Sequence, residues 1–377
     1  MKTGLLVLGL IAPSLLFANE IEKWDPAMAQ RNALIDTNGV KWIDGKYLPI
    51  EGRVFDDTEQ YYDRLPKNVT TNVNGGVREM KSHTSGMLFR FRTNSKKLTF
   101  KWIPTSTWLS MDHMPATGKS GIDVYRFDTK SQTWRYVKTG RIGDAIVGAT
   151  LTIDWTPGDA CIVNLPLYNG IKSFKLGIDP TAMIESLGPH KSGVNKPVVF
   201  YGTSITHGGC ASRPGLGFVN LVGRHLDVPV VNLGFSGSGW MEYEMSEHLA
   251  RIDASCYVLD CLWNMRVSEK ETPGRSIEKN YEPFIRNLHA KRPKVPIIMA
   301  EHCNVYGNEK NEKDEFILKL YQKLKAEGGW DNLYYLPNDE MYAGDYEGTV
   351  DGCHPNDLGM MTLSQAFGKA ISKALGL

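Results

Sequence analysis

The sequence carries almost no net charge and has no long basic run. Its 43 lysine and arginine residues nearly balance 42 aspartate and glutamate residues, which leaves a net charge of +1 at pH 7. Proteins that attract the phosphates of nucleic acids generally present clustered positive charge. The composition therefore excludes nucleic acid as an expected partner.

Long apolar runs are missing beyond the first residues of the chain. Residues 4–17 form an apolar stretch that follows Lys2 and precedes the small residue Ala18. This arrangement is typical of a cleavable secretory signal, and the stretch is too short to span a bilayer comfortably. We therefore predict a signal peptide over residues 1–18, no membrane span, and a secreted or periplasmic mature protein.

Motifs for metals and nucleotide cofactors are also missing. The chain has no His-Glu-x-x-His and no paired Cys-x-x-Cys spacing, which argues against a zinc site. The Gly202-Thr203-Ser204 turn lacks the Gly-Lys-Ser/Thr ending of a phosphate-binding loop, and no Gly-x-Gly-x-x-Gly follows it. We therefore predict neither a metal nor a cofactor.

Cysteine is sparse, since six residues in 377 do not make the dense disulfide framework of a small secreted domain. Cys256 and Cys261 have an odd spacing within one apolar run, so they should point to opposite faces of a strand as buried thiols. Cys210 and Cys353 each lie beside a candidate catalytic residue. The sequence leaves open whether these two form a bridge.

The length of 377 residues favours two domains, and the first of them reads as β-structure. Phe89 and Phe91 alternate with arginines, and Phe100 and Trp102 alternate with lysine and threonine. Such short alternating runs between turns predict an all-β sandwich over residues 19–185. A connector rich in Gly, Pro, Ser and Lys follows over residues 179–196.

The second predicted domain, residues 186–377, alternates apolar runs with amphipathic helical patterns. Residues 218–226 and 245–252 each carry an apolar helix face, and apolar residues from Ile317 to Leu324 recur at i, i+3, i+4 and i+7. Strands that alternate with helices predict a parallel sheet covered on both faces. The expected strands are residues 198–201, 230–233, 256–262, 295–300 and 333–336. Ligands bind at the carboxyl ends of such strands.

Three polar residues supply the groups of a hydrolytic triad. Ser204 follows the first predicted strand, and the Asp-x-x-His formed by Asp351 and His354 comes near the C-terminus. A serine hydroxyl needs a base to become a nucleophile, so His354 is the expected base and Asp351 its orienting partner. By itself, Ser204 could be a helix-capping residue, and Asp351 and His354 could belong to a polar loop. The three residues together favour catalysis. His207 lacks a local carboxylate and ranks below His354 as base.

Hydrogen-bond donors for an oxyanion are expected at the same sheet edge. Gly237 lies in a Gly-rich run after the second predicted strand, and Asn264 follows the third. Glycine-rich turns and strand-end asparagines are common without any function, but these two follow consecutive strands of one predicted sheet.

Four neighbouring residues stay ambiguous in the sequence. Glu301 and His302 fit loop or supporting roles better than catalysis. Trp240 and Trp263 fit sugar stacking or core packing.

These blocks resemble the SGNH, or GDSL-like, hydrolase superfamily. Its blocks are matched in order by Gly202-Thr203-Ser204 (with Thr for the common Asp), Gly237, Asn264, and Asp351 with His354. The third block departs from the usual Gly-x-Asn-Asp, because it reads Cys261-Leu262-Trp263-Asn264-Met265. The resemblance covers roughly residues 196–377. It implies a three-layer fold with a flavodoxin-like parallel sheet, Ser204 as nucleophile, and an oxyanion hole from the Ser204 N–H, the Gly237 N–H and the Asn264 amide.

The first domain resembles the one that precedes the catalytic domain in a bacterial subgroup of this superfamily. The Gly-x-Asp-Leu-Tyr motif that names it is matched by Gly121-Ile122-Asp123-Val124-Tyr125, with Val for Leu. By itself this segment reads as one more edge strand. Its position before an SGNH-like domain favours the resemblance, and we predict a jelly-roll-like sandwich.

The sequence therefore predicts a secreted serine esterase that hydrolyses short acyl esters, with acetyl groups on carbohydrate as the expected substrate. The choice of acetylated carbohydrate as substrate rests on analogy with bacterial relatives and on the predicted export. It also rests on the 16 Tyr, 13 Phe and 9 Trp residues, because aromatic side chains often face carbohydrate. Two alternatives stay open. A lipid or thioester acylhydrolase would use the same triad with an apolar groove, and a catalytically silent carbohydrate-binding protein would bind glycans without turnover.

Overall fold

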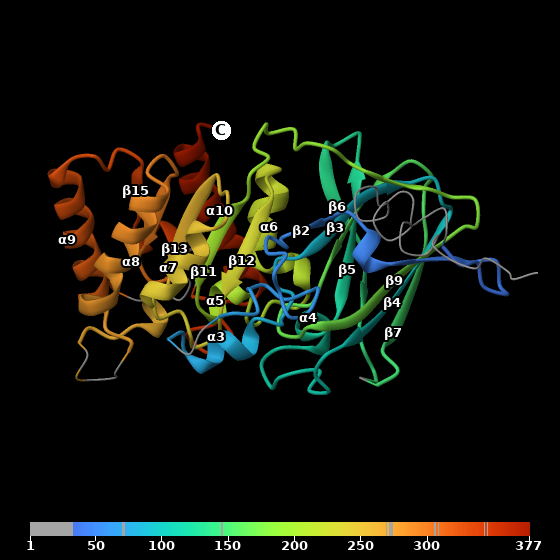
Figure 1. The fold of residues 1–377 in the computed structure, drawn as a ribbon, viewed down its shortest axis with the longest axis horizontal. Coiled ribbons are helices and arrows are strands. Elements are labelled where there is room, and N and C mark those ends of the chain that lie inside the picture. The colour runs from blue at the N-terminus through green and yellow to red at the C-terminus, as the bar shows by residue number, and fades with distance from the viewer. Residues whose placement is uncertain are drawn as a thin grey trace, which may run out of the picture.

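A computed structural model places a β-rich region beside an α/β region (Figure 1). The structure describes residues 33–377 except 70, 71, 145, 269, 271–273, 305, 306, 308, 343 and 345. The predicted signal peptide, residues 1–18, lies outside the described residues.

Within the described residues, the first region contains a four-stranded antiparallel sheet, β1-β9-β4-β7, and a six-stranded one, β10-β3-β8-β5-β6 with β2 beside β3. The predicted alternation is present in β4, where Leu98, Phe100 and Trp102 are buried at every second position. The strands are β1 (Lys41–Asp44), β2 (Ile50–Glu51), β3 (Leu88–Thr93), β4 (Lys97–Pro104), β5 (Ile122–Asp128), β6 (Thr133–Gly140), β7 (Ala149–Asp154), β8 (Ala160–Asn164), β9 (Ile171–Ile178) and β10 (Ile184–Ser186).

The two antiparallel sheets share one apolar core. The ring centroids of Phe89 in β3 and Phe174 in β9 lie 4.7 Å apart, and both rings belong to the same buried cluster. Antiparallel sheets that bury one face each against the other form a sandwich. The jelly-roll-like connection pattern stays a prediction.

Two details of this region differ from the prediction. The predicted connector over residues 179–196 contributes β10, which pairs with β3, so the chain leaves this sheet only after Ser186. The strand that carries the Gly-x-Asp-Leu-Tyr-like motif, β5, lies between β8 and β6 and is not an edge strand. Neither feature is visible in local periodicity, because each depends on which distant strand becomes the neighbour.

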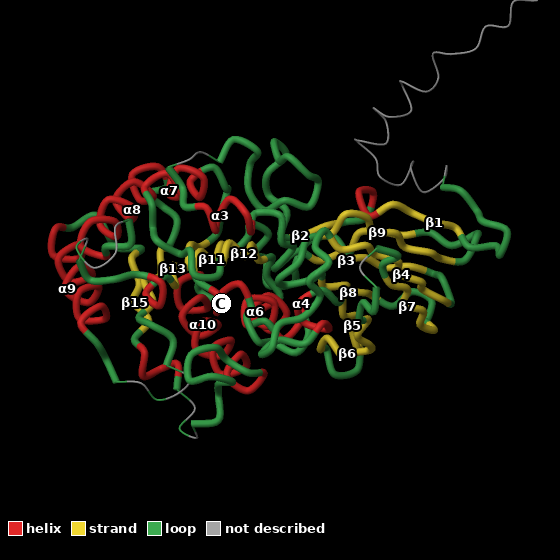
Figure 2. Tube along the Cα trace, turned by 90° about the horizontal axis from the view of Figure 1, so that it is seen from below, coloured by secondary structure: helices red, strands yellow, loops and turns green. Residues whose placement is uncertain are grey.

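In the described part of the second region, five parallel strands form a sheet with the order β12-β11-β13-β14-β15. This is the 2-1-3-4-5 order of a flavodoxin-like sheet, as the resemblance implied. Helices cover both faces of this sheet (Figure 2). The strands are β11 (Val198–Gly202), β12 (Val230–Gly234), β13 (Cys256–Asp260), β14 (Ile297–Ala300) and β15 (Leu333–Leu336). The helices that pack on the sheet or extend from its strands include α5 (Ser204–His207), α6 (Phe218–Leu226), α7 (Tyr243–Ala250), α8 (Ile277–Lys291), α9 (Glu312–Glu327) and α10 (Asp357–Leu375).

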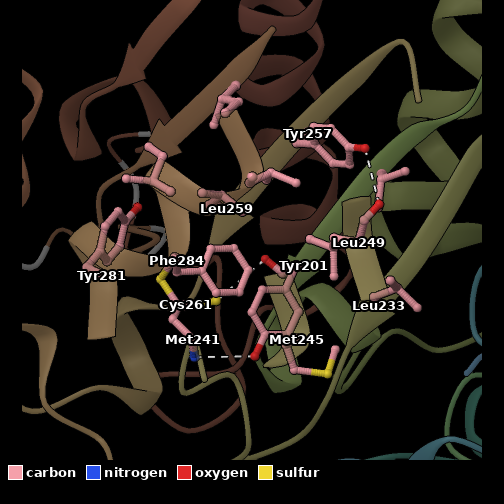
Figure 3. Packing of buried hydrophobic residues seen from close by; sticks show 14 of the residues in the cluster. Tyr201, Leu233, Met241, Met245, Leu249, Tyr257, Leu259, Cys261, Tyr281 and Phe284 are labelled. Atoms are coloured by element: carbon pink, nitrogen blue, oxygen red, sulfur yellow. Dashed lines mark hydrogen bonds between the residues drawn. The ribbon is translucent and has the colours of Figure 1, made fainter. Parts of the chain in front are cut away.

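Alternate residues of β11 face two separate cores. Val199 and Tyr201 join the cluster formed with α7, α8 and α9, whereas Val198 and Phe200 join the one formed with α6 and α10. Figure 3 shows the first cluster, in which the Tyr201 ring stacks on Phe284 of α8 with centroids 5.4 Å apart. A strand that is buried on both faces explains why this segment is continuously apolar in the sequence.

The cysteines follow the same two-sided pattern. Cys256 and Cys261 belong to opposite cores, as their odd spacing predicted. All six cysteines lie among the described residues and are free, including Cys210 and Cys353.

The Gly-x-Asp-Leu-Tyr-like motif joins the two regions. Asp123 is fully buried, and its Oδ2 accepts hydrogen bonds from Nη1 of Arg213 and from the N–H of Gly215, each at 2.9 Å. The hydroxyl of Tyr125 also contacts Arg213. A Cβ on Gly215 would lie 2.5 Å from the Tyr125 ring, so this loop of the α/β region needs a glycine. The motif thus acts as a docking contact between the domains.

Candidate active site

Ser204 lies where β11 gives way to the short helix α5. Thr203 is the N-cap of α5, and its hydroxyl accepts a hydrogen bond from the Ile205 N–H. Gly202 ends β11, and a Cβ there would lie 2.0 Å from Oγ1 of Thr206. The tight strand-to-helix turn, which only glycine allows at this point, therefore presents Ser204 at the carboxyl end of the sheet.

The loop before α10 brings the other two triad candidates to Ser204. Nε2 of His354 lies 2.9 Å from Oγ of Ser204, across 150 positions of sequence. Nδ1 of His354 lies 2.8 Å from Oδ2 of Asp351. The three side chains therefore form one continuous hydrogen-bonded chain.

Asp351 is held by its own loop as well as by the imidazole. Its Oδ1 accepts the backbone N–H groups of His354 at 2.7 Å and of Cys353 at 3.0 Å. Burial would raise the pKa of Asp351, but the hydrogen bonds from the backbone and imidazole of His354 outweigh it and lower the pKa. An ionised Asp351 accepts the Nδ1–H of His354, which leaves Nε2 to accept a proton from Ser204.

Both oxyanion candidates follow strands that flank β11. Gly237 has φ +66°, and no atom lies within 4 Å of the place of a Cβ, so its left-handed backbone rather than crowding favours glycine. Nε1 of Trp240 donates to the Gly237 carbonyl at 2.7 Å and fixes this turn. Oδ1 of Asn264 accepts the Gly239 N–H at 3.1 Å, which orients the amide with Nδ2 pointing away from Gly239.

Three residues left ambiguous by the sequence have structural contacts. Nε1 of Trp263 donates to the Cys303 carbonyl at 3.2 Å, and its ring packs against the core shared with α10. Nδ1 of His302 lies 2.6 Å from Oδ2 of Asp314, in the first turn of α9. Glu301 is buried and accepts a backbone N–H of the loop after β15. These contacts support the loops around the site and account for the three residues without a part in catalysis.

The sandwich domain contacts the backbone of Ser204 and α5, which the sequence did not predict. The hydroxyl of Tyr168 donates to the carbonyl of Ser204 at 2.8 Å, and the Tyr168 ring stacks on His207 with centroids 4.0 Å apart. The hydroxyl of Ser85 donates to the His207 carbonyl at 2.7 Å. Two residues of the first domain therefore hold both ends of α5.

A buried arginine completes this contact. Nη1 of Arg64 donates to the carbonyls of Asn232 and Gly234 in β12, at 3.0 and 2.8 Å. Nε2 of His207 lies 3.3 Å from Nδ1 of His83. Burial, and next the nearby Arg64 charge, lower the pKa of His207 well below its usual value. His207 is therefore a neutral packing residue beside the site, in keeping with its low rank as a base.

One group of side chains at the site has the composition of a metal site. His113, Cys210 and His354 each place a ligand atom within 4.8 Å of the others, and the rings of His113 and His354 meet edge to face at 5.6 Å. Cys210 has φ +71°, a conformation that is strained for any residue with a Cβ. His113 comes from the sandwich domain and lies far in sequence from Cys210 and His354, so no local spacing motif marks this group in the sequence.

Comparisons with known proteins agree with this architecture. Residues 195–372 match the GDSL-like lipase/acylhydrolase family, and residues 40–184 match the N-terminal domain of SGNH-hydrolase-type esterases. The resemblance predicted from the sequence is therefore confirmed for both halves of the chain. No curated protein matches significantly. None of the described helices is both long and apolar enough to cross a membrane.

Solved structures resemble the chain over both regions. A GDSL-like lipase from Bacteroides ovatus is 28% identical, with a TM-score of 0.78 over 89% of this chain and 98% of that one. A salicylyl-acyltransferase from a tetracycline biosynthetic pathway is 16% identical, with a TM-score of 0.70 over 91% and 99%. A family two carbohydrate esterase from Cellvibrio japonicus is 11% identical, with a TM-score of 0.57 over 89% and 98%. At these low identities, the acyltransferase and the carbohydrate esterase show only that this chain has the same fold as they do.

Proposed function

We propose that this two-domain member of the SGNH, or GDSL-like, superfamily is a serine esterase that removes short acyl groups, in particular acetyl, from carbohydrate. The observation that carries the proposal is the chain of hydrogen bonds from Oγ of Ser204 through His354 to Asp351. The family itself consists of esterases and acylhydrolases. We further propose Ser204, His354, Asp351, Gly237 and Asn264 as the catalytic residues.

The first half of the reaction acylates the serine. Oγ of Ser204 attacks the ester carbonyl carbon while Nε2 of His354 takes the hydroxyl proton. The carbonyl oxygen becomes an oxyanion, which the N–H groups of Ser204 and Gly237 and Nδ2 of Asn264 stabilise. The bond from carbon to the alcohol oxygen then breaks, and His354 gives its proton to the departing alcohol.

The second half releases the acid. Water enters, His354 removes one of its protons, and the resulting hydroxide equivalent attacks the acyl carbon. The bond to Oγ of Ser204 breaks as His354 returns the proton to it. Asp351 stays ionised throughout, because its hydrogen bonds lower its pKa, and it stabilises the imidazolium formed in each half.

The proposal for the substrate rests on architecture and expected location. Family two carbohydrate esterases share both domains of this fold, and we propose export from the predicted signal peptide over residues 1–18. An extracellular or periplasmic esterase meets acylated polysaccharide in that setting. Proteins described as a lipase and as an acyltransferase have the same fold. The fold alone therefore does not decide which ester is the substrate.

The test compares acetate release by the wild type and by Ser204→Ala on acetylated xylan, mannan and pectin, with p-nitrophenyl acetate as a simple ester. Loss of the nucleophile should lower kcat by about 10⁴-fold or more. Ser186→Ala, at an exposed serine of β10, is the matched control and should retain full activity. A drop of less than about tenfold in Ser204→Ala would point to another nucleophile. Cleavage of long-chain but not acetyl esters would favour the lipid acylhydrolase.

A further inference from the structure

A cavity of about 580 Å³ opens at the domain boundary, lined by β5 and β6 of the sandwich and by residues around α6. None of Ser204, Asp351 and His354 lines it, so it is a second site. Its volume falls in the range of small-molecule binding sites. Tyr125 and Arg213, which contact each other across the domain boundary, line one of its walls.

The sandwich contributes aromatic rings to this cavity. Phe127 and Trp134 meet edge to face with centroids 5.3 Å apart, and Tyr125 and Tyr136 do so at 6.1 Å. Trp134 and Tyr136 are separated by two positions of β6, so they share one face of the strand. Tyr136 remains 48% exposed. The Arg213 guanidinium lies over one face of the Tyr136 ring, 4.2 Å from its centroid, so the other face is the one that can meet the apolar face of a sugar ring.

The α/β domain contributes an excess of positive charge. Arg213 is balanced by Asp123, and Asp227 is balanced by His190 at 3.1 Å. Arg224 and Lys191 also line the cavity, and neither forms an ion pair with a carboxylate among the residues that the structure describes. The cavity thus presents two cationic groups that protein carboxylates do not neutralise.

Arg224 is the better placed of these two groups for recognition. Its guanidinium lies 4.1 Å from the centroid of the Tyr125 ring, and its Nη1 donates to the Asn220 carbonyl at 3.3 Å. The planar guanidinium has further N–H donors in the fork geometry that matches a carboxylate. Nζ of Lys191 lies 4.4 Å from the centroid of the Phe127 ring. Cations above aromatic rings are held in place without losing their charge.

We propose that this cavity binds an acidic sugar unit of the acylated polysaccharide. The carboxylate of a hexuronic acid pairs with Arg224, and the pyranose ring lies against Trp134 and Tyr136. The identity of this polysaccharide as substrate rests on the proposed esterase function, but the binding of the acidic sugar does not. The site would select chains that carry carboxylates and tether them to the enzyme.

The test uses calorimetric titration of full-length Ser204→Ala, which leaves the ligand intact. A xylo-oligosaccharide with one glucuronic acid branch should bind at least about tenfold more tightly than the neutral oligosaccharide of equal length, because an ionic hydrogen bond contributes that much. Adding Arg224→Gln should abolish the difference. Adding Trp134→Ala should weaken both ligands by about tenfold, as loss of a stacking contact does. Lys130→Gln, at an exposed lysine outside the cavity lining, is the matched charge control and should bind both ligands as its parent does.

Each outcome decides one part of the proposal. Equal affinity for the acidic and neutral ligands would overturn the acidic-sugar assignment, and full competition by inorganic phosphate would reduce the cavity to a general anion site. Unchanged binding in Trp134→Ala, with a wild-type circular dichroism spectrum, would place the ligand elsewhere. Turnover of p-nitrophenyl acetate by the wild type is measured separately. Its absence would refute the esterase and leave the binding site standing.

Discussion

His190 connects the two domains through a pair of carboxylates, and this contact should make the stability of the protein depend on pH. Its Nδ1 lies 3.1 Å from Oδ1 of Asp227, the C-cap of α6, and its Nε2 lies 3.2 Å from Oε1 of Glu51 in β2. Burial would lower the pKa of His190, but the hydrogen bonds with Asp227 and Glu51 outweigh it and raise the pKa to about 9. His190 is therefore protonated in the folded protein at neutral pH.

The sign of the effect follows from the unfolded chain. An unfolded histidine has a pKa of about 6.5, whereas His190 in the folded protein has a pKa of about 9. Between about pH 6.5 and about pH 9 the folded protein therefore keeps a proton that the unfolded chain releases. The stabilisation is fully present below about pH 6.5 and is lost as the pH rises through about 9. A difference of about 2.5 pKa units corresponds to about 3 kcal/mol. Because Glu51 and Asp227 are 25% and 28% exposed, solvent screening should reduce this to about 1–2 kcal/mol.

Denaturant unfolding of the wild type and of His190→Gln at pH 7 and pH 10 measures this contribution. The free-energy difference between the two proteins should shrink by about 1–2 kcal/mol over this range, since lysines, tyrosines and other groups cancel in the comparison. His225→Gln is a matched control, because burial lowers the pKa of His225 and that group is uncharged throughout the range. Parallel pH profiles for the wild type and His190→Gln would refute the ion network.

Three predictions concern the site itself. Asn264→Ala should lower kcat for p-nitrophenyl acetate by about 10²–10³-fold with little change in KM, as loss of an oxyanion donor does; an unchanged kcat would remove Asn264 from the mechanism. Tyr168→Phe removes the hydrogen bond to the Ser204 carbonyl but keeps the ring, so unfolding should become easier by about 1 kcal/mol and kcat should fall several-fold. A wild-type kcat in this variant would show that Ser204 needs no support from Tyr168. Added Zn²⁺ should inhibit hydrolysis of p-nitrophenyl acetate by occupying Nε2 of His354, and a chelator should restore the activity. His113→Asn should need about tenfold more zinc for the same inhibition, because one metal ligand is lost. Equal sensitivity of the wild type and His113→Asn to zinc would contradict the metal group.

The sequence predicted the parts of this fold that depend on local pattern. The period-two runs and the continuous apolar runs mark the strands, because burial on one or both faces imposes those periods. Ser204, Asp351 and His354 were found because each follows a strand end or precedes a helix at a place that parallel sheets bring together. Boundaries are predicted less closely: the strand expected over residues 256–262 ends at Asp260, and the one expected over residues 295–300 begins at Ile297.

The sequence did not reveal the contacts between the domains. Tyr168 lies in a loop after β8 and looks like an ordinary aromatic core residue, yet it bonds to Ser204 across 36 positions. Arg64 looks like a surface charge but is 2% exposed and reaches β12 across 168 positions. No periodicity encodes such pairs, because they depend on how the chain before the sandwich strands packs against the α/β region: Leu65 and Val77 are buried in the core of that region. The motif at Asp123 and Tyr125 was found only as a resemblance.

These interdomain contacts imply that the α/β domain is not an independent enzyme. Without the residues before 187, the carbonyls of Asn232 and Gly234 lose the Arg64 donors, and the carbonyl of Ser204 loses Tyr168. The core of the α/β region also loses the buried side chains that the first region contributes to it, Phe55, Leu65, Val73 and Val77. Each lost hydrogen bond of this kind costs about 1 kcal/mol or more, and all three carbonyls lie beside the turn that positions Ser204. A protein of residues 187–377 should therefore hydrolyse p-nitrophenyl acetate at least about a hundredfold more slowly than the full chain, even if circular dichroism shows it folded. A folded fragment with the full kcat would mean that the sandwich serves binding alone.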